Sequence, residues 1–76
     1  MEKLLKILKS IHPRADFANE TALVDKRILD SLDIIALIGE LEETFDVEIG
    51  VEYIEPENFN SVDAMAKLLK QLGADL

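Results

Sequence analysis

Residues 30–45 read Asp30-Ser31-Leu32-Asp33 followed by IIALIGELEETF, and this stretch decides how the chain is expected to fold. Asp30 is a favourable N-cap, and Asp33 at the third helical position lies near the positive end of the helix dipole. Apolar residues then recur at three- and four-residue spacing as far as Phe45. The stretch therefore predicts an amphipathic helix with the Ser31 hydroxyl in its first turn.

Projection at about 100° per residue gives this helix two different faces. The side expected to face the core carries Ile34, Leu37, Ile38, Leu41 and Phe45. The opposite side is a small, partly apolar strip with an acidic rim, made of Leu32, Asp33, Ile35, Ala36, Gly39, Glu40 and Glu43. A helix buried on one face only does not need this strip. Either a second element covers it, or it is a contact surface for another protein.

The same periodicity predicts two further helices. The first runs from about Glu2 to Ile11 and is stopped by Pro13. The last begins after Asn60 as N-cap, with Asp63 at its third position, and ends at Gly73. Its inner face is expected to contain Val62, Met65, Ala66, Leu69 and Leu72.

Two connections without helical periodicity join these helices. The segment from His12 to Leu29 is predicted to be a packed loop, because apolar anchors are spread along it: Phe17, Leu23, Val24, Ile28 and Leu29. Residues 47–51 alternate like a strand, but no second strand exists to pair with them. We therefore expect an extended connection and a short turn around Tyr53 to Phe59, with Pro56 in its first position. The fold class is all-α, in one domain of residues 1–76.

Length and composition limit the classes of protein that remain. A chain of 76 residues buries only about 60% of its unfolded surface, so it has little core for an enclosed active site and is not expected to be an enzyme. No apolar run approaches the roughly 20 residues of a membrane span, so no membrane insertion is expected. The first residues mix charges with apolar side chains, which is untypical of a secretory signal, and there is no cysteine. These features predict a cytoplasmic protein.

The negative charge is concentrated in the middle of the chain. The net charge is −8, and the span from Ile28 to Ala66 holds eleven acids and no Lys or Arg. The acids are Asp30, Asp33, Glu40, Glu42, Glu43, Asp46, Glu48, Glu52, Glu55, Glu57 and Asp63. Such a field repels nucleic acid and steers basic protein surfaces towards it. The alternative is that the acids serve only to keep a small protein soluble.

Most chemical motifs are missing from the sequence. His12 is expected to be a solvated residue, and nothing supports a Ser-His-Asp arrangement with Ser31, so no catalytic residue is predicted. No segment matches a calcium-binding loop, and the three glycines are too far apart for a phosphate cradle. No metal site is predicted. Ser31 remains as the candidate for chemistry.

The residues around Ser31 resemble those of the acyl carrier protein family. The resemblance rests on Asp30-Ser31-Leu32-Asp33, the helix after it and the motif Phe45-Asp46-Val47-Glu48-Ile49. In that family the matching serine receives 4'-phosphopantetheine from coenzyme A. The resemblance therefore implies Ser31 as the covalent attachment site. It also implies a small four-helix bundle, with three main helices, one short helix and a long loop between the first and second helices.

The resemblance further implies a monomeric carrier of acyl or aminoacyl thioesters, of the kind used in fatty acid or lipid biosynthesis. Its partners would be a phosphopantetheinyl transferase and the enzymes that load and transfer the cargo, which would dock through basic surfaces. The expected docking residues are Asp30, Leu32, Asp33, Ile35, Ala36, Gly39, Glu40 and Glu43. An alternative from another class is an acidic helical interaction module that binds a basic protein without being modified.

Two departures bear on the kind of carrier. Lys26-Arg27-Ile28-Leu29 occupies the stretch in which carriers of this family usually have a glycine. The connection over residues 53–60 is more similar to D-alanyl carriers or specialised stand-alone bacterial carriers. Lys26 and Arg27 are expected to contact a specific partner or to lie in a solvated loop.

Overall fold

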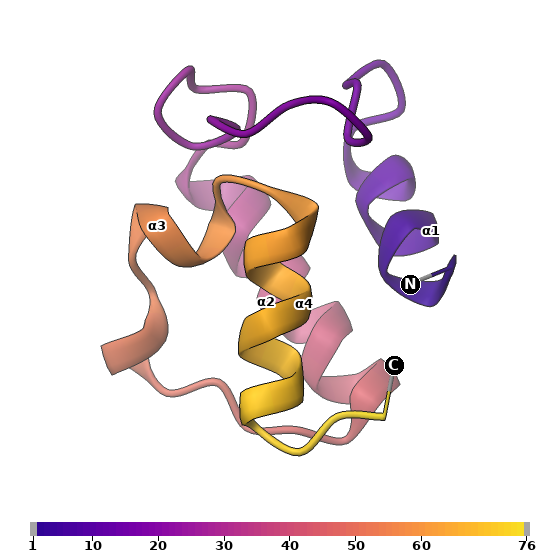
Figure 1. Cartoon of the computed structure of the whole chain (residues 1–76), viewed down its shortest axis with the longest axis vertical. Coiled ribbons are helices and arrows are strands. Elements are labelled where there is room, and N and C mark those ends of the chain that lie inside the picture. Colours follow the sequence, from indigo (N-terminus) through magenta and orange to yellow (C-terminus); the bar gives the residue numbers. More distant parts are fainter. Residues whose placement is uncertain (1, 76) are drawn as a thin grey trace.

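The computed structural model describes residues 2–75, and its regular elements are all helices (Figure 1). Three long helices and two short ones follow one another as α1 (Glu2–Ile11), α2 (Ser31–Phe45), the 3₁₀ helix η1 (Val51–Tyr53), α3 (Pro56–Phe59) and α4 (Val62–Gln71). No strand occurs within these residues. The expected all-α fold with a long loop between the first two main helices is confirmed.

The three long helices each bury one apolar face in a common core. Helix α1 packs against α2 and α4, and α3 packs against α4. The side chains with almost no exposed surface are Leu4, Leu8, Leu23, Leu29, Leu37, Leu41, Phe59, Met65 and Leu69. No polar or charged residue of the described chain is fully buried. Since burial of one such apolar side chain stabilises by about 1.5–3 kcal/mol, hydrophobic burial holds these helices together.

The long loop between α1 and α2 is packed, as expected. Phe17, Leu23 and Leu29 are buried, while Val24 and Ile28 are partly buried against the core. The backbone N–H of Leu29 donates to the carbonyl of Leu23 at 3.0 Å, which curls the end of the loop towards α2. The loop therefore holds the start of α2 in a definite position.

The predicted N-cap of the last helix is wrong by one residue. Ser61 caps α4, and its Oγ accepts a hydrogen bond from the N–H of Ala64 at 3.0 Å. Asn60 instead turns its side chain to the long loop, where its Oδ1 accepts from the N–H of Val24 at 2.9 Å. Asp63 consequently lies at the second helical position. Gly73 follows α4 with a φ of 97°, as expected of a residue that ends a helix.

The connection after α2 forms one more helical turn than expected. Residues 47–50 have no regular structure, with Ile49 buried, but the 3₁₀ helix η1 already begins at Val51. Pro56 occupies the first position of α3, as predicted, where its missing N–H costs no hydrogen bond. Segment η1–α3 thereby lies along one side of α2 (Figure 1).

Candidate functional site

Ser31 is the first residue of α2, and two aspartates fix the turn that contains it. The N–H of Asp33 donates to Asp30 Oδ1 at 2.9 Å, and the N–H of Asp30 donates to Asp33 Oδ2 at 3.2 Å. These reciprocal bonds form a capping box. The prediction of Asp30 as N-cap and Asp33 at the third position is confirmed.

The polar groups of Ser31 are free within the described chain. Its side chain is exposed, and no hydrogen bond to another described residue engages its Oγ. By contrast, Ser10 Oγ donates to the carbonyl of Ile7 at 2.7 Å, and Ser61 Oγ accepts from Ala64. The N–H groups of Ser31 and Leu32 also lack an acceptor among residues 2–75. An accessible hydroxyl therefore lies beside unpaired donors at the positive end of a helix.

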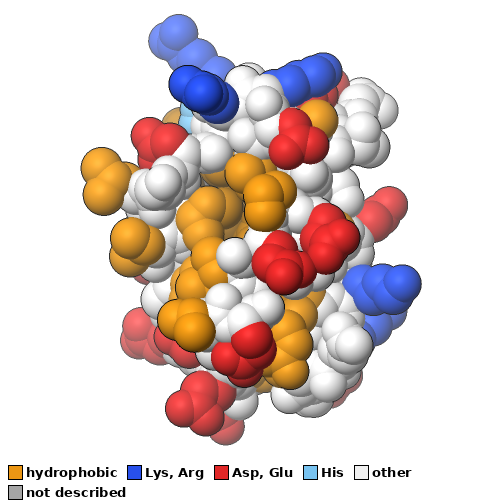
Figure 2. Space-filling view, turned by 90° about the vertical axis from the view of Figure 1, so that its left-hand side faces the viewer, with side chains coloured by type: hydrophobic (Ala, Val, Ile, Leu, Met, Phe, Trp, Pro, Cys, Tyr) orange, Lys and Arg blue, Asp and Glu red, His pale blue; other side chains and the backbone are white. Residues whose placement is uncertain are grey.

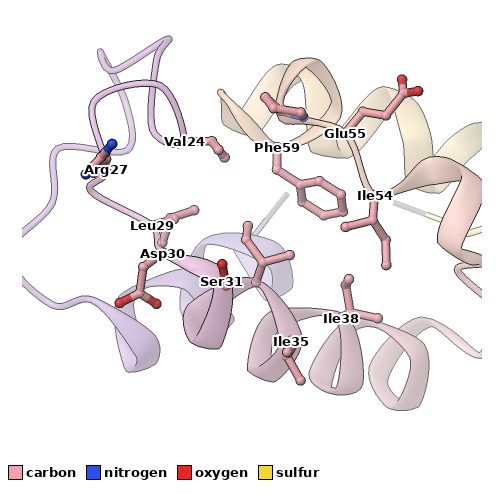
Figure 3. Close-up of a pocket in the computed structure, with 12 residues that line it drawn as sticks. Val24, Arg27, Leu29, Asp30, Ser31, Ile35, Ile38, Ile54, Glu55 and Phe59 are labelled. Carbon is pink, nitrogen blue, oxygen red and sulfur yellow. The ribbon is translucent and has the colours of Figure 1, made fainter.

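A groove of about 670 Å³ runs from Ser31 between α2 and segment η1–α3 (Figure 3). This volume is within the roughly 300–1,000 Å³ range of small-molecule sites. The groove is lined by Val24, Arg27, Leu29, Asp30, Ser31, Ile34, Ile35, Ile38, Ile54, Glu55, Pro56 and Phe59. It is therefore mostly apolar, with a few polar groups.

The groove has a polar end and an apolar end. Figure 3 shows Arg27 and Asp30 on one side of Ser31 and Ile38 and Ile54 on the other, where Ile38 of α2 faces Ile54 of the η1–α3 segment. The carboxylate of Glu55 points away from the groove. A flexible ligand attached at Ser31 could thus lie with its charged part near Arg27 and its apolar part between Ile38 and Ile54.

The small strip on the outer face of α2 is not covered by any other described element. Leu32 is 76% exposed and Ile35 is 68% exposed. Ala36, Gly39, Glu40 and Glu43 are also exposed, whereas Asp33 is half-buried. Figure 2 shows exposed apolar side chains next to acidic ones on one side of the molecule. Within residues 2–75, the possibility of a covering element is ruled out, and the role of the strip as a contact surface stays a prediction.

Glu55 has the one carboxyl in the described chain whose pKa departs clearly from its usual range. A hydrogen bond with the Glu57 side chain and repulsion between the two carboxylates raise the pKa of Glu55.

Residues 2–75 contain no cluster of three or more acidic or histidine side chains able to hold a metal ion. None of their helices combines the length and apolar character needed to cross a bilayer.

His12 is not among the residues that line the groove. It is half-buried at the end of α1, and its Nδ1 is buried without a hydrogen-bond partner among the described residues. His12 is therefore partly withdrawn from solvent, whereas a solvated residue was expected.

Sequence reasoning missed the groove, because three separate segments form it. Ile54 and Phe59 come from the η1–α3 segment, while Arg27 comes from the long loop. Lys26 and Arg27 also differ in surroundings, since Lys26 pairs with Glu20 whereas Arg27 lines the groove. Only the predicted turn around Pro56 indicated that a second element would lie near α2.

Comparison with known proteins finds a family match over most of the chain. Residues 2–69 match the family model described as "Phosphopantetheine attachment site". The chain is 43% identical over 53 residues to the "Acyl carrier protein" of Buchnera aphidicola subsp. Baizongia pistaciae (strain Bp). It is 36% identical over 56 residues to the "Probable acyl carrier protein PigG" of Serratia sp. (strain ATCC 39006).

The two alignments leave part of each protein unmatched. They cover 70% and 74% of this chain, but 65% and 64% of the respective relatives. The chain thus spans just under two thirds of the length of these relatives. No solved structure matches the chain significantly.

Proposed function

Because the chain belongs to the acyl carrier protein family, we propose that it carries acyl groups as thioesters on a 4'-phosphopantetheine arm attached to Ser31. The observation that carries this proposal is the free, exposed Ser31 hydroxyl at the start of α2, at the polar end of an apolar groove. The chain itself would not be an enzyme, since partner enzymes would perform the chemistry on the cargo.

The residues around Ser31 fit such a group. The unpaired N–H groups of Ser31 and Leu32 are suited to a phosphodiester, because helix N-termini bind anions. The bound arm would supply the thiol for the thioester, which this chain without cysteine lacks. The groove would offer the apolar parts of the arm and cargo a place away from water.

Ser31 would act as the nucleophile when the arm is attached. Its Oγ would attack the phosphorus of coenzyme A that bears the pantetheine, forming a P–O bond as the pyrophosphate bond breaks. The hydroxyl proton would pass to a base of the transferase, and adenosine 3',5'-bisphosphate would leave. Ser31 needs no base from its own chain, because the transferase would supply base and metal.

An apolar acyl cargo suits the groove better than an aminoacyl cargo. Its more buried lining includes Ile34, Ile38 and Phe59, which offer no hydrogen-bonding side chain to an ammonium group. Burial of an unpaired charge among such residues is strongly unfavourable. We therefore propose acyl groups as the cargo that the fold can shelter.

We also propose the strip on α2 as the docking surface for partner enzymes. Leu32 and Ile35 would form its apolar centre, and Asp30, Glu40 and Glu43 would contribute to its acidic rim. Exposed ion pairs contribute only about 0.2–1 kcal/mol each, so docking through this surface would be weak and rapidly reversible. Weak docking suits a carrier that visits several enzymes.

Intact mass spectrometry tests the attachment. The purified chain is incubated with coenzyme A, Mg²⁺ and a broad-specificity phosphopantetheinyl transferase. We expect the wild type to gain the mass of one phosphopantetheine and Ser31→Ala to gain none. Ser61→Ala is the matched control, because it also removes a serine from a helix start and should still be modified. An unmodified wild type would instead support an unmodified interaction module.

The docking surface is tested through the rate of the same reaction. Leu32→Ala and Ile35→Ala should each lower kcat/KM of the transferase for the carrier several-fold. Val51→Ala removes an equally exposed apolar side chain from η1, which lies outside the strip, and should leave kcat/KM unchanged. Equal losses in all three variants would show that no specific surface on α2 is used.

A further inference from the structure

Arg27 is the one basic residue among those lining the groove. Its neighbour Lys26 is held by an ion pair, with Lys26 Nζ 3.0 Å from Glu20 Oε1. That contact is the one ion pair among residues 2–75, so Arg27 has no carboxylate partner there. Its guanidinium is available to a ligand that reaches the polar end of the groove.

The backbone of Arg27 adopts a conformation that glycine would tolerate better. Its φ is 60°, in the left-handed region that costs an ordinary residue free energy. The following residues Ile28 and Leu29 turn inward towards the core, which leaves Arg27 exposed at the bend. A cationic side chain therefore borders the groove at a position where a side chain is unfavourable for the backbone.

Such a cation would stabilise a phosphodiester on Ser31. The carboxylates of Asp30 and Asp33 lie on the same turn and would repel the new negative charge. The free N–H groups of α2 offset part of this repulsion. A guanidinium offers several donors in a plane and can bind two phosphate oxygens at once.

We propose that Arg27 binds the phosphodiester of the arm on Ser31 and so directs the arm along the groove. This inference rests on the proposed function, since it requires that Ser31 be modified. Figure 3 shows Arg27 and Asp30 at the end of the groove opposite Ile38 and Ile54. With its phosphate held at this polar end, the arm extends towards the apolar end instead of into solvent.

The effect of Arg27 is modest and sensitive to salt. An exposed ion pair changes an equilibrium about two- to fivefold, and added salt screens it. Arg27→Gln should therefore reduce the ratio of bound to free phosphate by about two- to fivefold. The same loss should appear in the wild type when salt is raised to 1 M, where the Debye length falls to about 3 Å.

Phosphorus NMR of the modified protein tests this inference. The ³¹P chemical shift and transverse relaxation of the phosphodiester are measured at low and high salt in the wild type, Arg27→Gln and Arg27→Gly. Lys26→Gln is the matched control. It removes the same charge from the neighbouring residue, whose side chain pairs with Glu20. Circular dichroism checks that each variant folds, and Arg27→Gly also relieves the left-handed backbone.

We expect both Arg27 variants at low salt to resemble the wild type at high salt, with a more mobile phosphate. Lys26→Gln should resemble the wild type measured at the same salt concentration. A phosphate signal that is the same in wild type and Arg27→Gln would overturn the inference. Equal effects of Arg27→Gln and Lys26→Gln would also overturn it, because they would indicate that the phosphate senses only the overall positive charge of the loop and makes no specific contact with Arg27. Intact mass distinguishes a failure of this inference from a failure of the proposed function. If only the inference fails, the proteins still carry phosphopantetheine; if the proposed function fails, neither the wild type nor any variant is modified.

Discussion

Asn60 joins two segments that lie far apart in the sequence. Its Oδ1 accepts hydrogen bonds from the N–H groups of Val24 and Asp25, at 2.9 and 3.1 Å. Its Nδ2 donates to Asp25 Oδ2 at 3.1 Å, and its carbonyl accepts from the N–H of Leu23 at 2.9 Å. The junction between α3 and α4 is thereby tied to the loop that leads to Arg27 and Ser31.

Asn60→Ala should lower the free energy of unfolding by about 1–2 kcal/mol, because it removes the side-chain bonds that satisfy two backbone N–H groups. Urea denaturation measures the change. Asn19→Ala is the matched control, since Asn19 makes one exposed bond to Asp16 and its loss should stay within about 0.5 kcal/mol. Similar values for the two variants would argue against a structural role for Asn60.

The pKa of the Glu55 carboxyl depends on its neighbour Glu57. Since Glu57 raises the pKa of Glu55, the Glu57→Gln substitution should bring that pKa back down towards the usual range for glutamate. A raised pKa favours the protonated carboxyl in the folded state. Its contribution to stability is therefore present at low pH and lost as the pH rises through that pKa.

Carboxyl ¹³C NMR titration of Glu55 measures this change in the wild type and in Glu57→Gln. Glu52→Gln serves as the control, because it removes a nearby exposed acid that does not contribute to the raised pKa. If Glu57→Gln does not change the pKa of Glu55, then Glu57 is not the cause of the raised pKa.

Helix α2 contains a glycine in its interior with no neighbour to explain it. A Cβ atom added at Gly39 would meet nothing within 4 Å, so lack of space does not require a glycine. Gly39 lies on the exposed strip beside Glu40 and Glu43. Glycine in a helix interior costs about 0.5–1 kcal/mol relative to alanine, because it loses more backbone freedom on folding.

Gly39→Ala should therefore raise the free energy of unfolding by about 0.5–1 kcal/mol. The same substitution at Gly73 should have the opposite sign, because Gly73 has a φ of 97° that alanine rarely adopts. Urea denaturation of the two variants, both without phosphopantetheine, measures their free energies of unfolding. Destabilisation by Gly39→Ala would mean that this position depends on glycine in a way that the fold does not explain.

Charge is unevenly distributed over the whole molecule. Eleven acids and no basic residue occupy the span from Ile28 to Ala66, whereas Lys3, Lys6 and Lys9 lie on the exposed side of α1. The single ion pair of the described chain offsets little of the repulsion among the acids. Folding brings these acids close together, so repulsion reduces the stability of the native state.

Raising NaCl from about 0.01 to 0.1 M shortens the Debye length from about 30 to 10 Å, which should stabilise the unmodified chain. A gain of about 1 kcal/mol is expected, as the sum of several contributions of a few tenths. The double variant Glu40→Gln, Glu43→Gln should gain less, because it starts with less repulsion. Unfolding free energies that do not change with salt in either protein would contradict this account.

The sequence predicted the elements that depend on local chemistry. The start of α2 followed from the capping pattern of Asp30 and Asp33, and both short-range bonds are present in the structure. The start of α4 was predicted wrongly, because Asn60 and Ser61 are both good caps and local preference could not rank them. A contact to Val24, 36 residues away, decided between them.

By itself, the sequence determined that this chain is a small acidic helical protein with a serine in the first turn of α2. Periodicity, caps and charge act over a few residues, so they can be read along the chain. Only the tertiary structure decided where the groove lies and that Arg27 borders it, because the loop, α2 and η1–α3 must first pack together. Such packing depends on the shapes of side chains that are distant in sequence, and no local pattern encodes it.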